Sequence, residues 1–535
     1  MILTSQFSLG QKENARGGAA LAAVVKDLYA EGQTDYGIEP IILQDASGRA
    51  IGRIKEGDAV VFCCRRGERE IQLTEAFTDP NLNQFPREKF SNLPFVILTL
   101  YHDKFKDLPV AFAPSKVKAT LGEVVSRSGL TQARISESEK FAHVTFFMNG
   151  GNGQAFPLEE DIRVPSLKGV LFDQHPELSL EQVAQKVVES LNKSTRLVVT
   201  NFANGDVIGH TANRDAKIRC AEHVDRHLQS VVNTALAADY VVLITADHGN
   251  LEELFTDDGS AHVSHTSNPV PFFILDPGTP AGVSPNAGRL ADIAPTILQV
   301  LKINAPAEMT GQSLAPHHDF GSERRVLLVI LDGWGISGNP DTDPIAIADT
   351  PFWDDLMTRY PHSSLEASGD AVGLKAGKAG NSEAGHMNIG AGRVILQDDV
   401  RLDTAMKDGT FYHNEVICGV INGVKERGTS LHLIGLLTEK SSHGSMDYPL
   451  AVLKMVKDAG LEHVYLHMIF DGRSTAPGSA PALLGKLVNL MDEIGIGQIA
   501  TGIGRGIALD RDGNYNKTQK AYDALVYGKG RGARL

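Results

Sequence analysis

A serine in a glycine-flanked turn is the first residue of this chain that could do chemistry. Ser382 lies in the sequence GNSEAGH at residues 380–386, where glycine lets the backbone approach an anion closely. Upstream, an apolar run at 326–331 ends in Asp332, and open α/β sheets bind ligands beyond the carboxyl ends of such strands. Each feature alone is more often an ordinary turn or strand end. Together with the residues below, we interpret Ser382 as a nucleophile and Asp332 as a metal ligand that activates it.

Five other residues of metal-ligating type lie at turns or after predicted strands. They are Asp206, His210, Asp247, His248 and His265. A spacing of four residues places Asp206 and His210 on one face if their segment is helical. With Asp332 and Ser382, the set offers carboxylate, imidazole and hydroxyl ligands, which suit two divalent metals such as Mn²⁺, Zn²⁺ or Mg²⁺. Two such metals can lower the pKa of a serine hydroxyl and neutralise charge on a transferring phosphoryl group.

The length and composition predict a multidomain globular protein. A chain of 535 residues is longer than a single domain with one hydrophobic core usually is. Its content of 42% hydrophobic and 22% charged residues is ordinary for globular proteins. The formal net charge of -14 argues against non-specific binding to nucleic acid or an anionic membrane. If the substrate is anionic, positive charge must therefore be concentrated in one cleft.

The lack of a recognisable secretory pattern and the cysteine usage favour a cytoplasmic location. The N-terminus has no charged region followed by a long apolar stretch. No apolar run approaches the roughly 20 residues that span a bilayer. The four cysteines form no CxxC pair, so we expect reduced thiols rather than a zinc site.

The elements that must position these residues form three successive α/β segments. We place the boundaries at 1–112, 113–392 and 393–535, with a polar linker at 315–325 inside the second segment. Periodicity predicts helices at 19–29, 120–128, 215–238, 293–301, 450–459 and 482–494. It predicts strands at 38–43, 59–64, 95–100, 144–148, 197–200, 240–245, 326–331, 430–436, 463–469 and 498–500.

Basic residues follow several strands of the first and third segments. They are Arg66, Arg69, His443, Arg473, Arg505 and Arg511. Arginines at a strand end are more often part of a solvated surface than of a site. Here they stand where a ligand of an α/β sheet would bind.

Taken together, the motifs resemble those of the cofactor-independent (2,3-bisphosphoglycerate-independent) phosphoglycerate mutases of the alkaline phosphatase superfamily. The matching stretches are NFANGDVIGH at 201–210, ITADHGN at 244–250, SHTSNPVP at 264–271, EMTGQSL at 308–314, LVILDGWG at 328–335, GNSEAGHMNIGAGR at 380–393, GTSLHLIGLL at 428–437 and FDGR at 470–473. They cover nearly the whole chain.

The resemblance implies a fold of two α/β domains and a role for each residue above. It implies that one metal is held by Asp206, His210 and His265, and the other by Asp247, His248, Asp332 and Ser382. Ser382 would accept the phosphoryl group of a small phosphorylated acid, with Lys140 stabilising it and His443 contacting the substrate. The arginines Arg66, Arg69, Arg473, Arg505 and Arg511 would clamp the substrate's carboxylate and phosphate, a task that suits the planar guanidinium. The metal would be Mn²⁺, with Mg²⁺, Zn²⁺ or Co²⁺ as alternatives, and the protein a monomer.

The motifs stand in an unusual order. Family members begin with the LDG strand and end near EMTG, whereas here EMTG precedes LDG. The order predicts a circular permutation, which is tolerated where a surface loop can be opened without loss of core contacts. The metal-binding domain would then be continuous over 113–392, and the smaller transferase domain would be assembled from both chain ends.

The departures from the family pattern all lie in the transferase segments. Ser474 stands where the family has an aspartate after the FDGR arginine, and Gly506-Ile507 stand where tyrosines follow Arg505. The stretch 438–445 lacks the family's glycines and second histidine, and Cys64-Arg65 replace an Asn-Phe. Loss of a general base typically removes ~10²–10⁴-fold in rate. Three hypotheses therefore remain: a mutase of 3- and 2-phosphoglycerate, a phosphoryl-transfer enzyme for another phosphorylated or phosphono carboxylic acid, and a non-catalytic binding protein.

Overall fold

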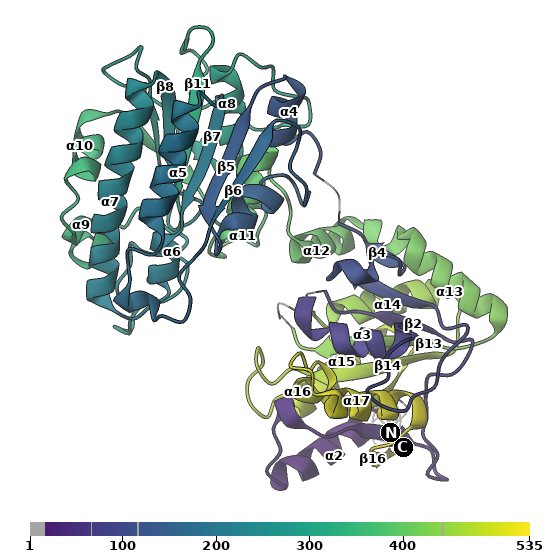
Figure 1. The fold of residues 1–535 in the computed structure, drawn as a ribbon. Coiled ribbons are helices and arrows are strands. Elements are labelled where there is room, and N and C mark those ends of the chain that lie inside the picture. The colour runs from purple at the N-terminus through teal and green to yellow at the C-terminus, as the bar shows by residue number, and fades with distance from the viewer. Residues whose placement is uncertain (1–15, 66, 115–116, 440, 442) are drawn as a thin grey trace, which may run out of the picture. The chain divides into compact units, whose positions relative to one another are not determined.

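Two α/β units make up the chain. The computed structural model describes residues 16–535 except 66, 115–116, 440 and 442. A central unit lies between 115 and 400, and a terminal unit is formed by the chain up to Pro114 and from Arg401 onward (Figure 1). The expected boundaries, 112/113 and 392/393, differ from these by two and eight residues, and helix α12 (Asp398–Asp408) crosses the second division. Among the described residues, no helix is long and apolar enough to cross a membrane.

The central unit is built on an eight-stranded sheet of order β10-β12-β9-β8-β11-β7-β5-β6. Its strands are β5 (Gln132–Glu137), β6 (Glu159–Val164), β7 (Leu197–Phe202), β8 (Tyr240–Thr245), β9 (Val270–Leu275), β10 (Gly288–Arg289), β11 (Arg325–Leu331) and β12 (His362–Glu366). The run from β8 to β6 is parallel, and β9 is antiparallel to both of its neighbours. The carboxyl ends of the parallel strands therefore share one edge with the start of β9.

Helices cover the faces of this sheet. They are α4 (Leu121–Arg127), α5 (Leu180–Asn192), α6 (Asn204–Gly209), α7 (Arg214–Ala237), α8 (Ile293–Val300), α9 (Pro344–Ile347), α10 (Pro351–Arg359) and α11 (Ser382–Ala391). Figure 1 shows α5 and α7 running across the near face. The central strands β7, β8 and β11 are almost completely buried, as expected for a parallel sheet covered on both sides.

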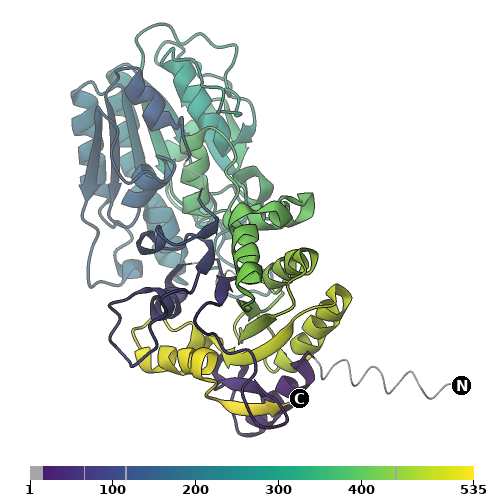
Figure 2. The same ribbon diagram turned by 90° about the vertical axis from the view of Figure 1, so that its right-hand side faces the viewer.

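The terminal unit has a second eight-stranded sheet, of order β16-β1-β15-β14-β13-β2-β3-β4. Its strands are β1 (Ile41–Gln44), β2 (Ala59–Phe62), β3 (Phe95–Thr99), β4 (Val110–Phe112), β13 (Leu431–Leu437), β14 (Val464–Phe470), β15 (Gln498–Gly504) and β16 (Arg531–Arg534). The run from β15 to β4 is parallel, and β1 is antiparallel to β15. The last strand, β16, pairs with β1, so purple and yellow segments lie side by side in Figure 2.

The helices of the terminal unit come from both ends of the chain. They are α2 (Gly18–Ala30), α3 (Ile71–Thr78), α13 (Glu415–Arg427), α14 (Asp447–Ala459), α15 (Ala480–Ile494), α16 (Arg505–Ala508) and α17 (Tyr515–Tyr527). One hydrophobic core contains Leu21 and Val25 of α2 beside Leu484 and Val488 of α15. Segments far apart in sequence thus share this core.

The structure confirms most of the predicted elements and corrects one. The predicted strand at 144–148 is a π-helical turn, η4 (His143–Phe147), because a short apolar run does not distinguish a strand from a buried helical turn. This turn packs so closely on α11 that a Cβ atom at Gly390 would lie 1.9 Å from the Met148 carbonyl oxygen. Several elements were not predicted, among them strands β5 and β6 and helix α5. The expected linker at 315–325 contains no helix and contributes only Arg325 to β11.

Candidate active site

The candidate nucleophile and metal ligands of the central unit gather at one edge of its sheet. Asp206 lies on α6 just after β7, Asp247 and His248 follow β8, and Asp332 follows β11. Lys140 follows β5, one of the strands that sequence reasoning missed. His265 precedes β9, which starts at the same edge because it runs antiparallel. The parallel topology is therefore what brings these distant residues together.

Ser382 is the first residue of α11 and is 6% exposed. Its Oγ donates to Asp332 Oδ1 at 3.2 Å and lies 3.0 Å from His248 Nε2. The preceding Asn381 accepts a hydrogen bond from the Ala384 N–H at 2.9 Å and caps the helix. The hydroxyl thus stands at a helix N-terminus, where the backbone favours negative charge.

Lys140 is the buried cation of the site. Its Nζ donates to Ser382 Oγ at 2.6 Å, to Asp206 Oδ2 at 2.6 Å and to Asp332 Oδ1 at 2.7 Å. Burial alone would lower the pKa of Lys140, but the attraction of Asp332, Asp206 and Asp247 outweighs it and holds the pKa above its ordinary value. A permanent positive charge therefore lies against the serine oxygen.

The first predicted metal group presents three ligand atoms to one another. Asp206 Oδ1 lies 3.2 Å from His210 Nε2 and 3.0 Å from His265 Nε2, and the two imidazole nitrogens are 3.1 Å apart. The opposite nitrogens donate to backbone carbonyls, His210 Nδ1 to Val263 at 2.9 Å and His265 Nδ1 to Gly380 at 2.8 Å. These bonds leave the lone pairs on the Nε2 atoms, which is how proteins orient histidine ligands. The donor set fits a divalent metal.

The second predicted metal group is buried and rich in negative charge. Asp247 Oδ1 accepts from the backbone N–H groups of His248 at 3.1 Å and Gly333 at 3.2 Å. Its Oδ2 is buried without a hydrogen-bond partner among the described residues. Such an atom is costly unless something binds it, and a divalent cation would satisfy it. The ligand atoms of Asp206, His248 and His265 also lie within 4.8 Å of one another, so His248 stands between the two groups.

The pKa values of the two carboxyl groups, Asp247 and Asp332, are shifted in opposite directions. Burial raises the pKa of Asp247, but His248, His386 and Lys140 more than offset it and hold the pKa well below its ordinary value. Burial and the neighbouring Asp247 raise the pKa of Asp332. Negative charges so close together repel one another, and a bound dication would relieve this repulsion.

Two residues of this site were not predicted. His386 is fully buried, its Nδ1 donates to the Ser382 carbonyl at 2.9 Å, and it lies 3.3 Å from Asp247 Oδ2. Asn201 Nδ2 donates to Asp332 Oδ2 at 2.6 Å and lies 3.1 Å from His386 Nε2. The ligand atoms of Asp247, Asp332 and His386 lie within 4.8 Å of one another. The signal for His386 was its place in GNSEAGH, one helical turn after Ser382.

The basic residues of the terminal unit lie near the carboxyl ends of its strands. Arg505 begins α16 directly after β15 and pairs with the buried Asp471. Arg69 is 7% exposed and donates to the Leu509 carbonyl at 3.1 Å. Arg473 is exposed beyond β14, and Arg511 is exposed beyond α16. Arg66 lies outside the described residues.

His443 has a buried partner that sequence reasoning missed. Its Nδ1 lies 3.0 Å from Glu70 Oε1, and Glu70 is fully buried. Burial raises the pKa of Glu70 even though His443 lowers it. Ser474, in the place of the expected aspartate, is exposed and donates to Ser441 Oγ at 3.4 Å. A hydroxyl pair therefore stands where a carboxylate was expected.

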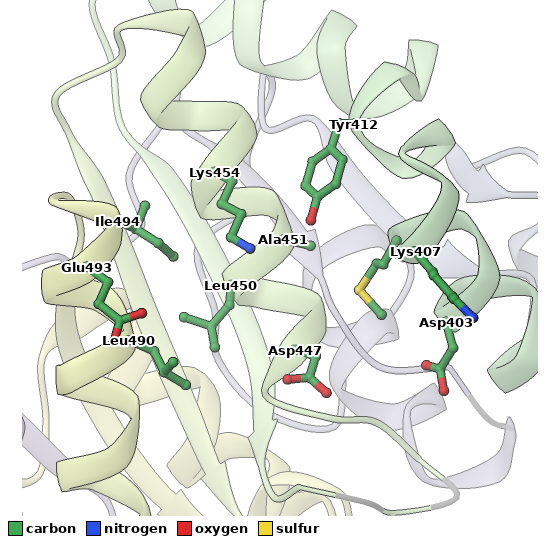
Figure 3. A pocket seen from close by; sticks show the side chains of 11 residues that line it. Asp403, Lys407, Tyr412, Asp447, Leu450, Ala451, Lys454, Leu490, Glu493 and Ile494 are labelled. Carbon is green, nitrogen blue, oxygen red and sulfur yellow. The ribbon is translucent and has the colours of Figure 1, made fainter.

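A cavity of about 450 Å³ in the terminal unit lies apart from these residues. Its lining comes from α12, η9 (Thr410–His413), α14 and α15 and includes Leu450, Leu490 and Lys454 (Figure 3). None of the predicted site residues lines it. We assign this cavity no role in the chemistry.

Comparisons with known proteins match the chain in two parts. The metalloenzyme superfamily matches residues 17–305, and the N-terminal domain of 2,3-bisphosphoglycerate-independent phosphoglycerate mutases matches residues 402–534. The 2,3-bisphosphoglycerate-independent phosphoglycerate mutase of Moorella thermoacetica is 43% identical over 291 residues, 54% of this chain and 56% of that protein. That of Listeria monocytogenes (strain EGD-e) is 41% identical over 294 residues, 54% and 57% of the two. The chain spans about half the length of the curated relatives it matches.

Among solved structures, the comparison finds the phosphoglycerate mutase of Leishmania mexicana, determined at low cobalt concentration. It is 29% identical, with a TM-score of 0.39, over 51% of this chain and 53% of that one.

Proposed function

Because this chain belongs to the metalloenzyme superfamily, we propose that it is a metal-dependent phosphoryl-transfer enzyme that interconverts 3-phosphoglycerate and 2-phosphoglycerate. The curated relatives named above carry the name of this mutase. One observation carries the proposal: Lys140 Nζ lies 2.6 Å from Ser382 Oγ, inside a cluster of three buried aspartates. This arrangement suits a serine that receives a phosphoryl group, because the charge of that group needs nearby cations.

The metal ligands would be those predicted from the sequence. Asp206, His210 and His265 would hold one divalent ion, and Asp247, His248, Asp332 and Ser382 the other. His386 would support the second set through its contacts with Ser382 and Asp247. When bound, the two ions would lower the pKa of the serine hydroxyl and neutralise phosphoryl charge. We propose Mn²⁺ as the native metal.

The side chains of the protein would carry out the transfer in two steps, first to Ser382 and then back to the substrate. Ser382 Oγ attacks phosphorus, so that the Oγ–P bond forms while the bond from phosphorus to the substrate oxygen breaks. The proton lost by the serine hydroxyl balances the proton gained by the leaving alkoxide. Lys140 stabilises the phosphoryl oxygens throughout. The glycerate then reorients, and its neighbouring hydroxyl takes the phosphoryl group back by the reverse of the same step.

The basic residues of the terminal unit would hold the rest of the substrate. We propose that Arg69, Arg473, Arg505 and Arg511, with Arg66, bind its carboxylate and phosphate groups, and that His443 contacts it. Glu70 would hold the His443 ring, since their atoms lie 3.0 Å apart. We also propose a circularly permuted order of the family's segments. Its support is that the matched relatives align over only half of each chain, as expected when a linear alignment can follow one segment order at a time.

A second candidate function is favoured by Ser474. Its hydroxyl, 3.4 Å from that of Ser441, cannot replace an aspartate as a base near neutral pH. The same phosphoserine chemistry could then serve another phosphorylated or phosphono carboxylic acid. We propose a cytoplasmic, monomeric enzyme in either case.

The test is an assay of the purified full-length chain with Mn²⁺ and 3-phosphoglycerate, coupled to enolase. Metal-dependent formation of 2-phosphoglycerate is expected, and its absence at every Mn²⁺ concentration would refute the mutase assignment. The Ser474→Asp variant separates the two candidates. A gain in mutase rate of tenfold or more would favour a cleft adapted to another acid.

A further inference from the structure

A short segment near the N-terminal end of the chain is inserted between two arginine-bearing strand ends of the terminal unit. The segment is η1 (Asp35–Gly37), which follows α2. Asp35 Oδ2 accepts from the backbone N–H groups of Gly478 at 2.9 Å and Ser479 at 3.2 Å, at the start of α15. On the other side, the Gly504 N–H donates to the Ile38 carbonyl at 2.8 Å. The segment is thus fixed to the chain that follows Arg473 and to the chain that precedes Arg505.

Three glycines leave the space that Tyr36 occupies. A Cβ atom at Gly472 would lie 2.4 Å from Tyr36 N, and one at Gly504 would lie 2.5 Å from Tyr36 O. A Cβ atom at Gly506 would lie 2.4 Å from Cε1 of the Tyr36 ring. These separations are shorter than any non-bonded carbon contact, so a side chain at each position would displace Tyr36. Gly472 directly precedes Arg473, and Gly504 and Gly506 flank Arg505.

The ring of Tyr36 also meets Arg473. The Arg473 Cζ atom lies 5.9 Å from the ring centroid, within the range of a cation–π contact. Arg473 is exposed and has no hydrogen bond or ion pair with another of the residues that the structure describes. A guanidinium over a ring keeps its five N–H donors available, because they lie in its own plane. This contact restricts a mobile side chain without using its hydrogen-bonding capacity.

From this geometry we infer that Tyr36 is a positioning residue, which holds Arg473 in place for the carboxylate of the substrate. The inference rests on the proposed function, in which Arg473 binds the carboxylate of a phosphorylated acid. Tyr36 acts through the face of its ring rather than through its hydroxyl. An arginine held in advance loses less side-chain freedom on binding, so the contact favours substrate affinity rather than the chemical step.

The test compares variants of the full-length enzyme in the coupled assay with 3-phosphoglycerate. Tyr36→Leu should raise KM two- to fivefold, the range of an exposed cation–π contact, and leave kcat within twofold. Tyr36→Phe keeps the ring and should behave like the parent enzyme. The matched control is Tyr360→Leu in the central unit, which removes another tyrosine ring that lies under an arginine, Arg359, at 5.2 Å. It should leave KM unchanged.

A double-mutant cycle separates positioning from a merely structural effect. In an Arg473→Ala background, Tyr36→Leu should raise KM no further. A further rise by the same factor, or no effect of Tyr36→Leu in the parent enzyme, would overturn the inference. If Tyr36→Leu does not fold, Gly506→Ala provides the same test, because its Cβ displaces the ring; an unchanged KM would again overturn it.

A readout without substrate distinguishes this inference from the proposed function. If the parent enzyme does not turn over 3-phosphoglycerate, the mutase assignment fails, but Tyr36 can still be tested. The rate at which phenylglyoxal modifies Arg473 is then measured by peptide mass spectrometry. The inference is supported if phenylglyoxal modifies Arg473 faster in Tyr36→Leu than in Tyr36→Phe. Where Gly506→Ala replaces Tyr36→Leu, the same comparison is made with that variant. Equal rates overturn the inference.

Discussion

Replacement of Lys140 by methionine should impair both catalysis and folding stability. The Nζ atom lies within 2.7 Å of three oxygens, those of Ser382, Asp206 and Asp332. The whole Lys140 residue is only 5% exposed. Methionine keeps most of the volume and removes the charge. Removal of one electrostatic group aimed at a transition state typically lowers kcat by about 10²–10³-fold. Loss of one partner of a buried ion pair typically costs about 3–5 kcal/mol.

The two effects should respond differently to metal. In EDTA, Lys140→Met leaves the aspartates without a cation, and the full loss in free energy of unfolding should be seen by urea denaturation. Saturating Mn²⁺ should restore part of this stability, because bound dications supply positive charge, but it should not restore kcat. The matched control is Lys302→Met, which breaks a surface ion pair with Asp319 of 2.6 Å and should cost less than about 1 kcal/mol. Activity of Lys140→Met within threefold of the parent would refute the role assigned to Lys140.

Three other predictions concern residues around the site and beyond it. His386→Ala should weaken Mn²⁺ activation about 10–100-fold, because the residue supports Ser382 and Asp247; unchanged activation constants would contradict this. Asn381→Ala removes the cap of α11 and should cost about 1 kcal/mol in urea denaturation, whereas no change would show that the cap is not needed. Burial raises the pKa of Asp343 to about 7 in the folded state from 3.8. The stability associated with its proton is complete below pH 4 and is lost as the pH rises through 7, so Asp343→Asn, which keeps the hydrogen bond to the Ile345 N–H, should gain stability relative to the parent over this range. Parallel pH profiles of the two proteins would contradict the assignment.

The residues of the candidate site could be proposed from the sequence, whereas some of the elements that position them could not. Strand-end aspartates such as Asp332 could be predicted because a buried parallel strand has an unmistakable apolar run and its carboxyl end is where ligands bind. Strand β6 was missed because four of its six residues are charged, in the sequence EEDIRV, so it lacks the apolar pattern. The turn at 143–147 was mistaken for a strand because VTFFM fits both structures.

Contacts between distant segments were beyond reach of the sequence. His386 and Asn201 are individually ordinary polar residues, and only the packing of α11 against the ends of β7 and β11 brings them together. Glu70 shows no pattern that would pair it with His443, 373 residues away. Tyr36 likewise gains its contact with Arg473 only through the fold. Such pairings follow from the tertiary structure, not from local spacing.

The most direct test of the central claim is the identification of the residue that carries the phosphoryl group. The full-length protein with Mn²⁺ and 3-phosphoglycerate would be acid-quenched, and its intact mass and peptides would be measured. We predict a mass gain of one phosphoryl group, located on Ser382 and absent in EDTA. Metal-dependent turnover by a Ser382→Ala variant, or a phosphoryl group on another residue, would contradict the account.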